Sequence, residues 1–152
     1  MPFIVNDRLE VAVMCGADGV HLGQSDRLAG ARGRVGPNRI LGISVAGREE
    51  ALAAEAMGAD YLGVTVWSTP TKPEAEGTGP AGLGEVCAAV TIPVVGIGGI
   101  NSGNLDEVFD AGASGIAVIS AVAARPDPAA ATRTLRQRID RREEGMHGTA
   151  NR

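Results

Sequence analysis

A short glycine-containing pattern recurs three times along the chain, and an apolar run follows it each time. The copies are residues 15–23 (CGADGVHLG), 57–65 (MGADYLGVT) and 111–119 (AGASGIAVI). A glycine that ends a helix, followed by a short apolar run, is typical of the point where a helix leads into a buried strand. The repeat therefore predicts a chain built from βα units.

Three further apolar runs bring the predicted strands to six, and a helical pattern lies between successive strands. These runs are residues 3–5, 40–43 and 94–97, and the helical patterns cover 9–15, 27–34, 48–57, 82–90, 105–111 and 128–139. Strictly alternating strands and helices predict a parallel sheet with right-handed crossovers. A closed barrel of this kind needs eight units and roughly 250 residues. We therefore expect either an open doubly wound sheet or an incomplete barrel.

Composition bounds the size of the fold and its partners. The chain has 152 residues, of which 44% are hydrophobic, which suits one domain. We expect this domain at residues 1–139 and a disordered charged tail at 140–152, where the apolar period stops. Aromatic residues make up 3% of the chain and the net charge is −4, which argues against a nucleic-acid surface. No apolar run reaches the roughly 18 residues of a membrane span.

Three residues with reactive side chains are expected to be structural. Cys15 and Cys87 stand singly in apolar helical stretches, without metal-ligand spacing, and we expect buried free thiols in a reducing cytoplasm. His21 lies inside an apolar strand, so we expect a packed, hydrogen-bonded histidine in the core. No Ser/His/Asp or Cys/His arrangement supports nucleophilic catalysis.

Acidic residues follow the first two predicted strands. In parallel βα proteins the chemistry lies at the C-terminal ends of the strands. Asp7 and Asp26 follow neighbouring strands, and two carboxylates there could hold one Mg²⁺ together with phosphate oxygens of a substrate. The alternative is that each aspartate caps the helix that follows it.

Three later strand ends carry groups that suit a phosphate. Ser44 ends the third strand, and the sequence Thr69-Pro-Thr-Lys72 follows the fourth in a long segment rich in proline and glycine. Adjacent glycines in residues 96–101 would let backbone N–H groups approach an anion. The respective alternatives are a turn or capping serine, a solvated surface loop and a tight structural turn.

Seven segments, taken together in order and spacing, resemble the thiamine phosphate synthase family. They are residues 3–7 (FIVND), 19–26 (GVHLGQSD), 42–44 (GIS), 58–63 (GADYLG), 69–72 (TPTK), 96–101 (GIGGIN) and 118–121 (VISA). The resemblance implies a TIM (β/α)₈ barrel, and because family members begin with two further βα units, we expect a barrel that lacks them. It also implies a cytoplasmic transferase of thiamine biosynthesis. The reaction joins 4-amino-2-methyl-5-hydroxymethylpyrimidine diphosphate to hydroxyethylthiazole phosphate and releases diphosphate, through a pyrimidine carbocation.

The resemblance also implies roles for individual residues. Asp7 and Asp26 would hold Mg²⁺, and Lys72 and Ser44 would be the catalytic residues. The pyrimidine diphosphate would contact Asn6, Ser44 and Lys72. The thiazole phosphate would contact Thr69, Pro70, Thr71, Gly99, Ile119 and Ser120. No protein nucleophile is needed, because Mg²⁺ and Lys72 would stabilise the charge of the leaving diphosphate.

Two other functions stay open. A related thiazole tautomerase would need an acid–base residue at 69–72, where the sequence is Thr-Pro-Thr-Lys. An inactive or partner-dependent phosphate-binding fragment would follow from missing strands, because two unpaired sheet edges favour association. We expect small-molecule substrates and a homo-oligomer that forms through these edges, and neither nucleic acid nor a membrane as a partner.

Overall fold

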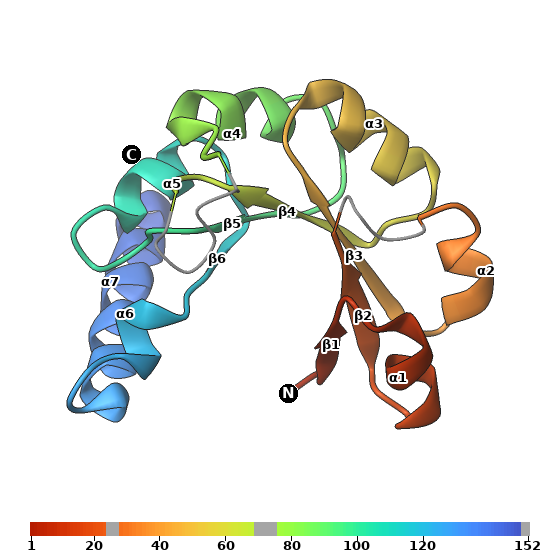
Figure 1. Ribbon diagram of the computed structural model, residues 1–152. Coiled ribbons are helices and arrows are strands. Elements are labelled where there is room, and N and C mark those ends of the chain that lie inside the picture. The colour runs from red at the N-terminus through yellow and green to blue at the C-terminus, as the bar shows by residue number, and fades with distance from the viewer. Residues whose placement is uncertain (24–27, 69–75, 150–152) are drawn as a thin grey trace.

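Six parallel strands form one curled sheet in the computed structural model, which describes residues 1–23, 28–68 and 76–149 (Figure 1). The strands are β1 (Ile4–Asn6), β2 (Gly19–Leu22), β3 (Ile40–Val45), β4 (Tyr61–Thr65), β5 (Val94–Ile97) and β6 (Gly115–Ala117). Their spatial order is their order in the chain. In a doubly wound sheet the strand order reverses at a switch point. The strand order does not reverse here, so the fold is an incomplete barrel, as the resemblance implies.

Helices cover the convex side of this sheet. They are α1 (Leu9–Met14), α2 (Ala31–Val35), α3 (Arg48–Ala56), α4 (Gly79–Cys87), α5 (Leu105–Asp110), α6 (Ser120–Ala123) and α7 (Pro128–Thr149). Helices α1 to α5 follow the curve of the sheet in chain order, while α6 and α7 lie together beyond β6 (Figure 1). No helix within the described ranges combines the length and the apolar character that a membrane span needs.

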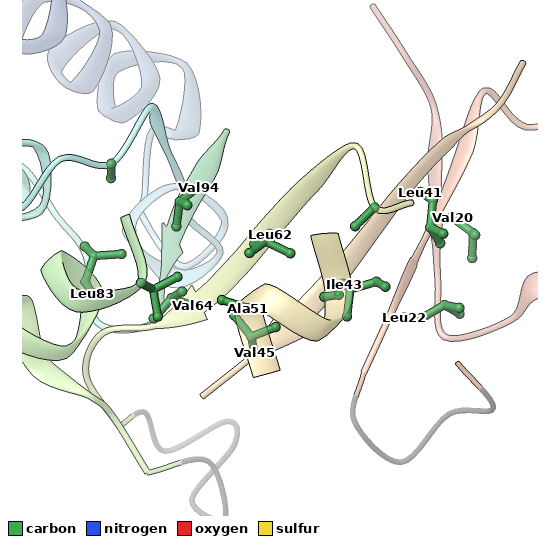
Figure 2. Packing of buried hydrophobic residues seen from close by; sticks show 14 of the residues in the cluster. Val20, Leu22, Leu41, Ile43, Val45, Ala51, Leu62, Val64, Leu83 and Val94 are labelled. Atoms are coloured by element: carbon green, nitrogen blue, oxygen red, sulfur yellow. The ribbon is translucent and has the colours of Figure 1, made fainter. Parts of the chain in front are cut away.

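The hydrophobic core lies between the convex face and the helices. Alternate strand residues point to this side and are buried there, among them Val20, Leu22, Leu41, Ile43, Val45, Leu62, Val64 and Val94. They pack against helix residues such as Ala51 and Leu83 (Figure 2). The intervening residues on the concave face, such as Ile40, Tyr61 and Val95, are only half-buried. One face of the sheet therefore provides the packing, and the other remains accessible.

The glycine-containing repeat forms a hydrogen-bonded clasp between successive strands. The backbone N–H of Asp18 donates to the carbonyl of Phe3 at 3.0 Å, and its Oδ2 accepts the N–H of Phe3 at 2.7 Å. Asp60 makes the same pair with Leu41, at 2.8 and 2.7 Å. The third copy keeps only the backbone bond, from Ser114 to Val94 at 2.8 Å. The repeat thus holds the start of a strand in register with the strand before it.

Helix α7 extends beyond its predicted end at Ile139 and runs to Thr149. The structure therefore has residues 140–149 in a helix, where the sequence predicts a disordered tail. Ion pairs continue where the apolar period stops: Arg138 and Arg142 reach Asp106 and Asp110 of α5, each at 2.5 Å. The guanidinium of Arg142 also lies 5.6 Å from the ring centroid of Phe109. Charge pairing, which hydrophobic periodicity does not report, extends this helix.

The two cysteines are free, as expected, but they are not both buried. Cys15 is exposed and Cys87 is half-buried. Cys15 is the C-cap residue of α1, beside the exposed Met14, whereas Cys87 packs against the core from α4. Burial raises the pKa of the Cys87 thiol.

A carboxylate on α3 holds the segment that leads into β5. Glu55 Oε1 accepts the hydroxyl and the backbone N–H of Thr91, each at 2.7 Å, and the N–H of Ile92 at 3.2 Å. These hydrogen bonds, with the Thr91 hydroxyl first among them, lower the pKa of Glu55 from its ordinary value of 4.5. The ionised form of Glu55 is therefore the form that the folded chain favours.

Replacing the clasp carboxylate should destabilise the fold more than breaking an ion pair alone. Asp60 Oδ2 accepts from Leu41 and also pairs with Arg32 at 2.5 Å. Asp60→Ala leaves the Leu41 amide without this acceptor, so we expect a loss of about 1–3 kcal/mol in the free energy of unfolding, measured in urea. Asp106→Ala, which removes exposed ion pairs with Arg138 and Arg142, should cost only about 0.5 kcal/mol. If Asp60→Ala and Asp106→Ala lowered the free energy of unfolding equally, the proposed role of the Asp60 carboxylate in the clasp would be contradicted.

The contribution of Glu55 should depend on pH. Because its pKa is lowered in the folded state, the stabilisation is present above the ordinary pKa of 4.5 and is lost as the pH falls through the lowered value. We expect wild type to exceed Glu55→Gln in urea midpoint at neutral pH, and the difference to shrink below pH 4.5. If Glu85→Gln, at an exposed glutamate of α4, gave the same profile, the contacts of Glu55 would not be the cause.

Candidate functional site

Several of the predicted site residues lie together at the C-terminal ends of the parallel strands. The structure places Asn6 in β1, Ser44 in β3 and Ser120 in α6, and places Asp7, Gly99 and Ile119 just beyond β1, β5 and β6. Asp26, Thr69, Pro70, Thr71 and Lys72 lie outside the described residues, and their roles stay predictions. Within the described ranges, no group of three or more His, Cys, Asp or Glu residues could hold a metal ion.

Asp7 occupies a strained turn at the end of β1. Its φ of 61° makes it the one non-glycine residue with positive φ in the described part of the chain. Its N–H donates to the carbonyl of His21 at 2.8 Å, and the N–H of Arg8 donates to Asn6 at 2.8 Å. Arg8, and not Asp7, is the N-cap of α1, so the capping alternative is wrong for Asp7. A left-handed turn costs energy, and such strain concentrates at functional sites.

Ser44 is linked to two other side chains on the concave face. His21 Nε2 lies 2.9 Å from Ser44 Oγ, and His21 Nδ1 lies 2.9 Å from the hydroxyl of Tyr61. A side chain at Gly42, on the strand between, would overlap the rings of both His21 and Tyr61. His21 is hydrogen-bonded, as expected, but it lies half-buried on the concave face rather than in the core. Ser44 lies within β3, so it is neither a turn residue nor a cap.

Tyr61 is the member of this group that sequence reasoning missed. It begins β4 directly after the clasp residue Asp60, and burial raises the pKa of its phenol. The sequence offers one signal for Tyr61, a polar aromatic residue in an apolar strand, two positions before Gly63. In the structure, a Cβ added to Gly63 would lie 3.0 Å from His21 Cε1. A residue without a side chain, next on the same face, indicates that a neighbouring ring occupies that space.

The turn after β5 requires glycine. Gly98 and Gly99 have φ values of 90° and 66°, and a Cβ at Gly98 would lie 2.5 Å from the carbonyl oxygen of Trp67. The amide side chains of Asn101 and Asn104 donate to the Gly99 carbonyl at 3.2 and 3.1 Å. Together these contacts hold the turn against the segment that follows β4.

Strand register places the last predicted residues beside this turn. Ile97 pairs with Ala117, so Gly99 and Ile119 each lie two residues beyond a paired position on neighbouring strands. Ile119 is 66% exposed, and the exposed Ser120 begins α6. The described residues thus form two groups at the C-terminal ends of the strands: Asn6, Asp7 and Ser44 at the ends of β1 and β3, and Gly99, Ile119 and Ser120 just beyond β5 and β6.

The donor atoms of the first group suit a hard cation. Asp7 offers a carboxylate and Asn6 an amide oxygen, and both side chains are exposed. Mg²⁺ is held in proteins by one or two carboxylates, with water and phosphate oxygens completing its shell. The carboxylate of Asp7 and the amide oxygen of Asn6 are therefore donor atoms of the kind that Mg²⁺ takes, and the Mg²⁺ site itself stays a prediction.

Comparisons with known proteins show which family this chain is similar to. The TMP-TENI family model, described as thiamine monophosphate synthase, matches residues 1–122. The thiamine-phosphate synthase of Methanoregula boonei is 50% identical over 145 residues, which cover 93% of this chain and 67% of that protein. The thiamine-phosphate synthase of Moorella thermoacetica is 51% identical over 142 residues, which cover 91% and 68%.

A solved structure supports the same relationship. The thiamine phosphate pyrophosphorylase of Pyrococcus furiosus superposes with a TM-score of 0.84 at 46% identity, covering 92% of this chain and 68% of that one. The chain therefore spans about two thirds of the length of these relatives. With its family match, its relatives and its curled parallel sheet in agreement, the chain belongs to the thiamine monophosphate synthase family of transferases.

Proposed function

We propose that this chain carries out the Mg²⁺-dependent joining of hydroxymethylpyrimidine diphosphate to hydroxyethylthiazole phosphate, with release of diphosphate. The observation that carries the proposal is the Asp7 carboxylate, which a strained turn holds at the C-terminal ends of the strands, as Ser44 is. The relatives named thiamine-phosphate synthase support the choice of reaction. A cytoplasmic location stays a prediction.

The chemistry assigned to the first group is stabilisation of the leaving diphosphate. Asp7 and Asp26 would hold Mg²⁺, which would supply positive charge to the phosphate oxygens. Asn6, Ser44 and Lys72 would bind the same diphosphate through an amide, a hydroxyl and an ammonium group. The bond between the pyrimidine methylene carbon and the diphosphate oxygen breaks and leaves its electron pair on oxygen. Positioned charge lowers the barrier to this step without a protein nucleophile.

The second group would position the acceptor. Gly99, Ile119 and Ser120, with Thr69, Pro70 and Thr71, would bind the phosphate of the thiazole. The glycine turn and the exposed Ser120 hydroxyl suit an anion, because small residues let donor groups approach its oxygens. The thiazole nitrogen then forms the new C–N bond with the pyrimidine carbocation, and the products are thiamine phosphate and diphosphate.

The two outer strands support a further part of the proposal, association through sheet edges. β1 and β6 each pair with a single neighbour within the described sheet. Phe3 and Asp7 make their backbone hydrogen bonds to the β2 side, so alternation directs the N–H of Ile4 towards the free edge. Unpaired edge groups favour pairing with another chain. The association proposed here joins copies of this chain.

Neutralising Asp7 should abolish the Mg²⁺-dependent reaction and leave the fold intact. Asparagine tolerates the left-handed turn as well as aspartate does, but it lacks the charge. We expect Asp7→Asn to lower thiamine phosphate formation by about 100-fold or more, measured by chromatography of the product. Asp110→Asn, at an exposed ion pair with Arg142, is the matched control and should retain full activity.

A binding measurement gives a second readout that does not need turnover. Calorimetry with inorganic diphosphate should show binding to the wild-type chain that requires Mg²⁺ and is weakened by Asp7→Asn. Unchanged binding and activity in Asp7→Asn would contradict the role of this carboxylate.

A proline at the free edge should reduce association without disturbing the sheet. Ile4→Pro removes the outward N–H, whereas Ile4→Ala shortens the side chain and keeps that N–H. We expect light scattering to give a mass above 15.5 kDa for wild type and Ile4→Ala, and a lower mass for Ile4→Pro. If the wild-type protein were monomeric at every concentration measured, association through this edge would be ruled out.

A further inference from the structure

Hydrogen bonds link Tyr61 to His21 and His21 to Ser44. Which group donates and which accepts in each bond follows from the chemistry of the three side chains. A neutral imidazole has one nitrogen that donates and one that accepts. Both ring nitrogens of His21 lie 2.9 Å from a hydroxyl oxygen. If Tyr61 donates to Nδ1, then Nε2–H donates to Ser44 Oγ. If Ser44 donates to Nε2, then Nδ1–H donates to the Tyr61 oxygen.

The first arrangement is favoured by the difference between the two hydroxyl groups. A phenol is far more acidic than an aliphatic alcohol and is therefore the stronger donor, whereas the serine oxygen is the better acceptor. Burial raises the pKa of Tyr61, so its phenol keeps its proton across the working pH range. Hydrogen bonds in such a chain polarise one another in one sense. The proton of Ser44 is then directed away from His21.

We propose that Tyr61 and His21 are positioning residues that hold the Ser44 hydroxyl as a donor towards an anionic oxygen at the open end of the sheet. The packing supports a single arrangement of the two rings, because Gly42 and Gly63 leave the space that they fill. The identity of the anion as a diphosphate oxygen rests on the proposed function. The direction of these hydrogen bonds is argued from the contacts of His21 with Tyr61 and Ser44 and does not depend on that function.

The tautomer of His21 tests the direction. The sequence contains two histidines, so nitrogen NMR of the ¹⁵N-labelled chain shows two imidazoles, and His147→Gln identifies the one that belongs to His21. Above the ordinary imidazole titration range we expect the proton of His21 on Nε2. Ser44→Ala should leave it there, because Tyr61 still donates to Nδ1. Tyr61→Phe removes the donor that holds Nδ1 as the acceptor, so the preference for the Nε2 proton should weaken. A proton on Nδ1 in the wild-type chain would overturn the proposal.

Binding of inorganic diphosphate with Mg²⁺ tests whether the two rings act through Ser44. We expect Ser44→Ala to weaken binding about tenfold and Tyr61→Phe about threefold. In the Ser44→Ala background, Tyr61→Phe should have no further effect, because the donor that it orients is gone. Independent, multiplying effects would show that Tyr61 does not act through Ser44, and they would overturn the proposal.

These outcomes are separable from those of the proposed function. A chain that makes no thiamine phosphate, but shows the Nε2 proton and the coupled effects on diphosphate binding, would contradict the proposed reaction and support the directed hydroxyl. An active protein with the His21 proton on Nδ1 would support the proposed reaction and contradict the directed hydroxyl.

Discussion

The hydrogen bonds that Asp18 and Asp60 make to the preceding strand determine where the other side chains of the sheet point. Parallel strands lack a hairpin to set their register, and a slip of one residue exchanges the two faces of a strand. Such a slip in β3 would bring Leu41 and Ile43 to the concave face and send Ser44 among the helices. By holding Leu41 at both its N–H and its carbonyl, Asp60 prevents this slip. The core and the candidate site therefore depend on the same contact.

Much of the architecture is predictable from the sequence because it follows from local patterns. The three copies of the repeat lie where a helix leads into β2, β4 or β6, and the apolar runs at 3–5, 40–43 and 94–97 lie in or overlap the remaining strands. Periodicity alone does not distinguish a doubly wound sheet from a barrel, because the two differ in strand order and not in strand pattern. The family resemblance makes that distinction. The end of α7 was misplaced because it depends on pairing with α5, which lies elsewhere in the chain.

The site is predictable in part, for a related reason. Asp7 and Ser44 can be found because they stand at the ends of apolar runs. The contact of His21 with Ser44 and Tyr61 joins residues 23 and 40 positions apart, and it depends on the register of three strands. Cys15 was misjudged on similar grounds, because an apolar stretch does not reveal which side of a helix its neighbours cover.

The clasp also has a consequence for how such a chain can change its length. Because the carboxylate that registers β2 or β4 comes from the residue just before that strand, each of these units carries its own means of alignment. A copy of the repeat added to such a sheet would bring its aligning carboxylate with it. Repetition of two βα units at a time is therefore a physical route by which a sheet of this type could lengthen, because the repeat recurs at every second strand and its carboxylate is present in the copies before β2 and β4.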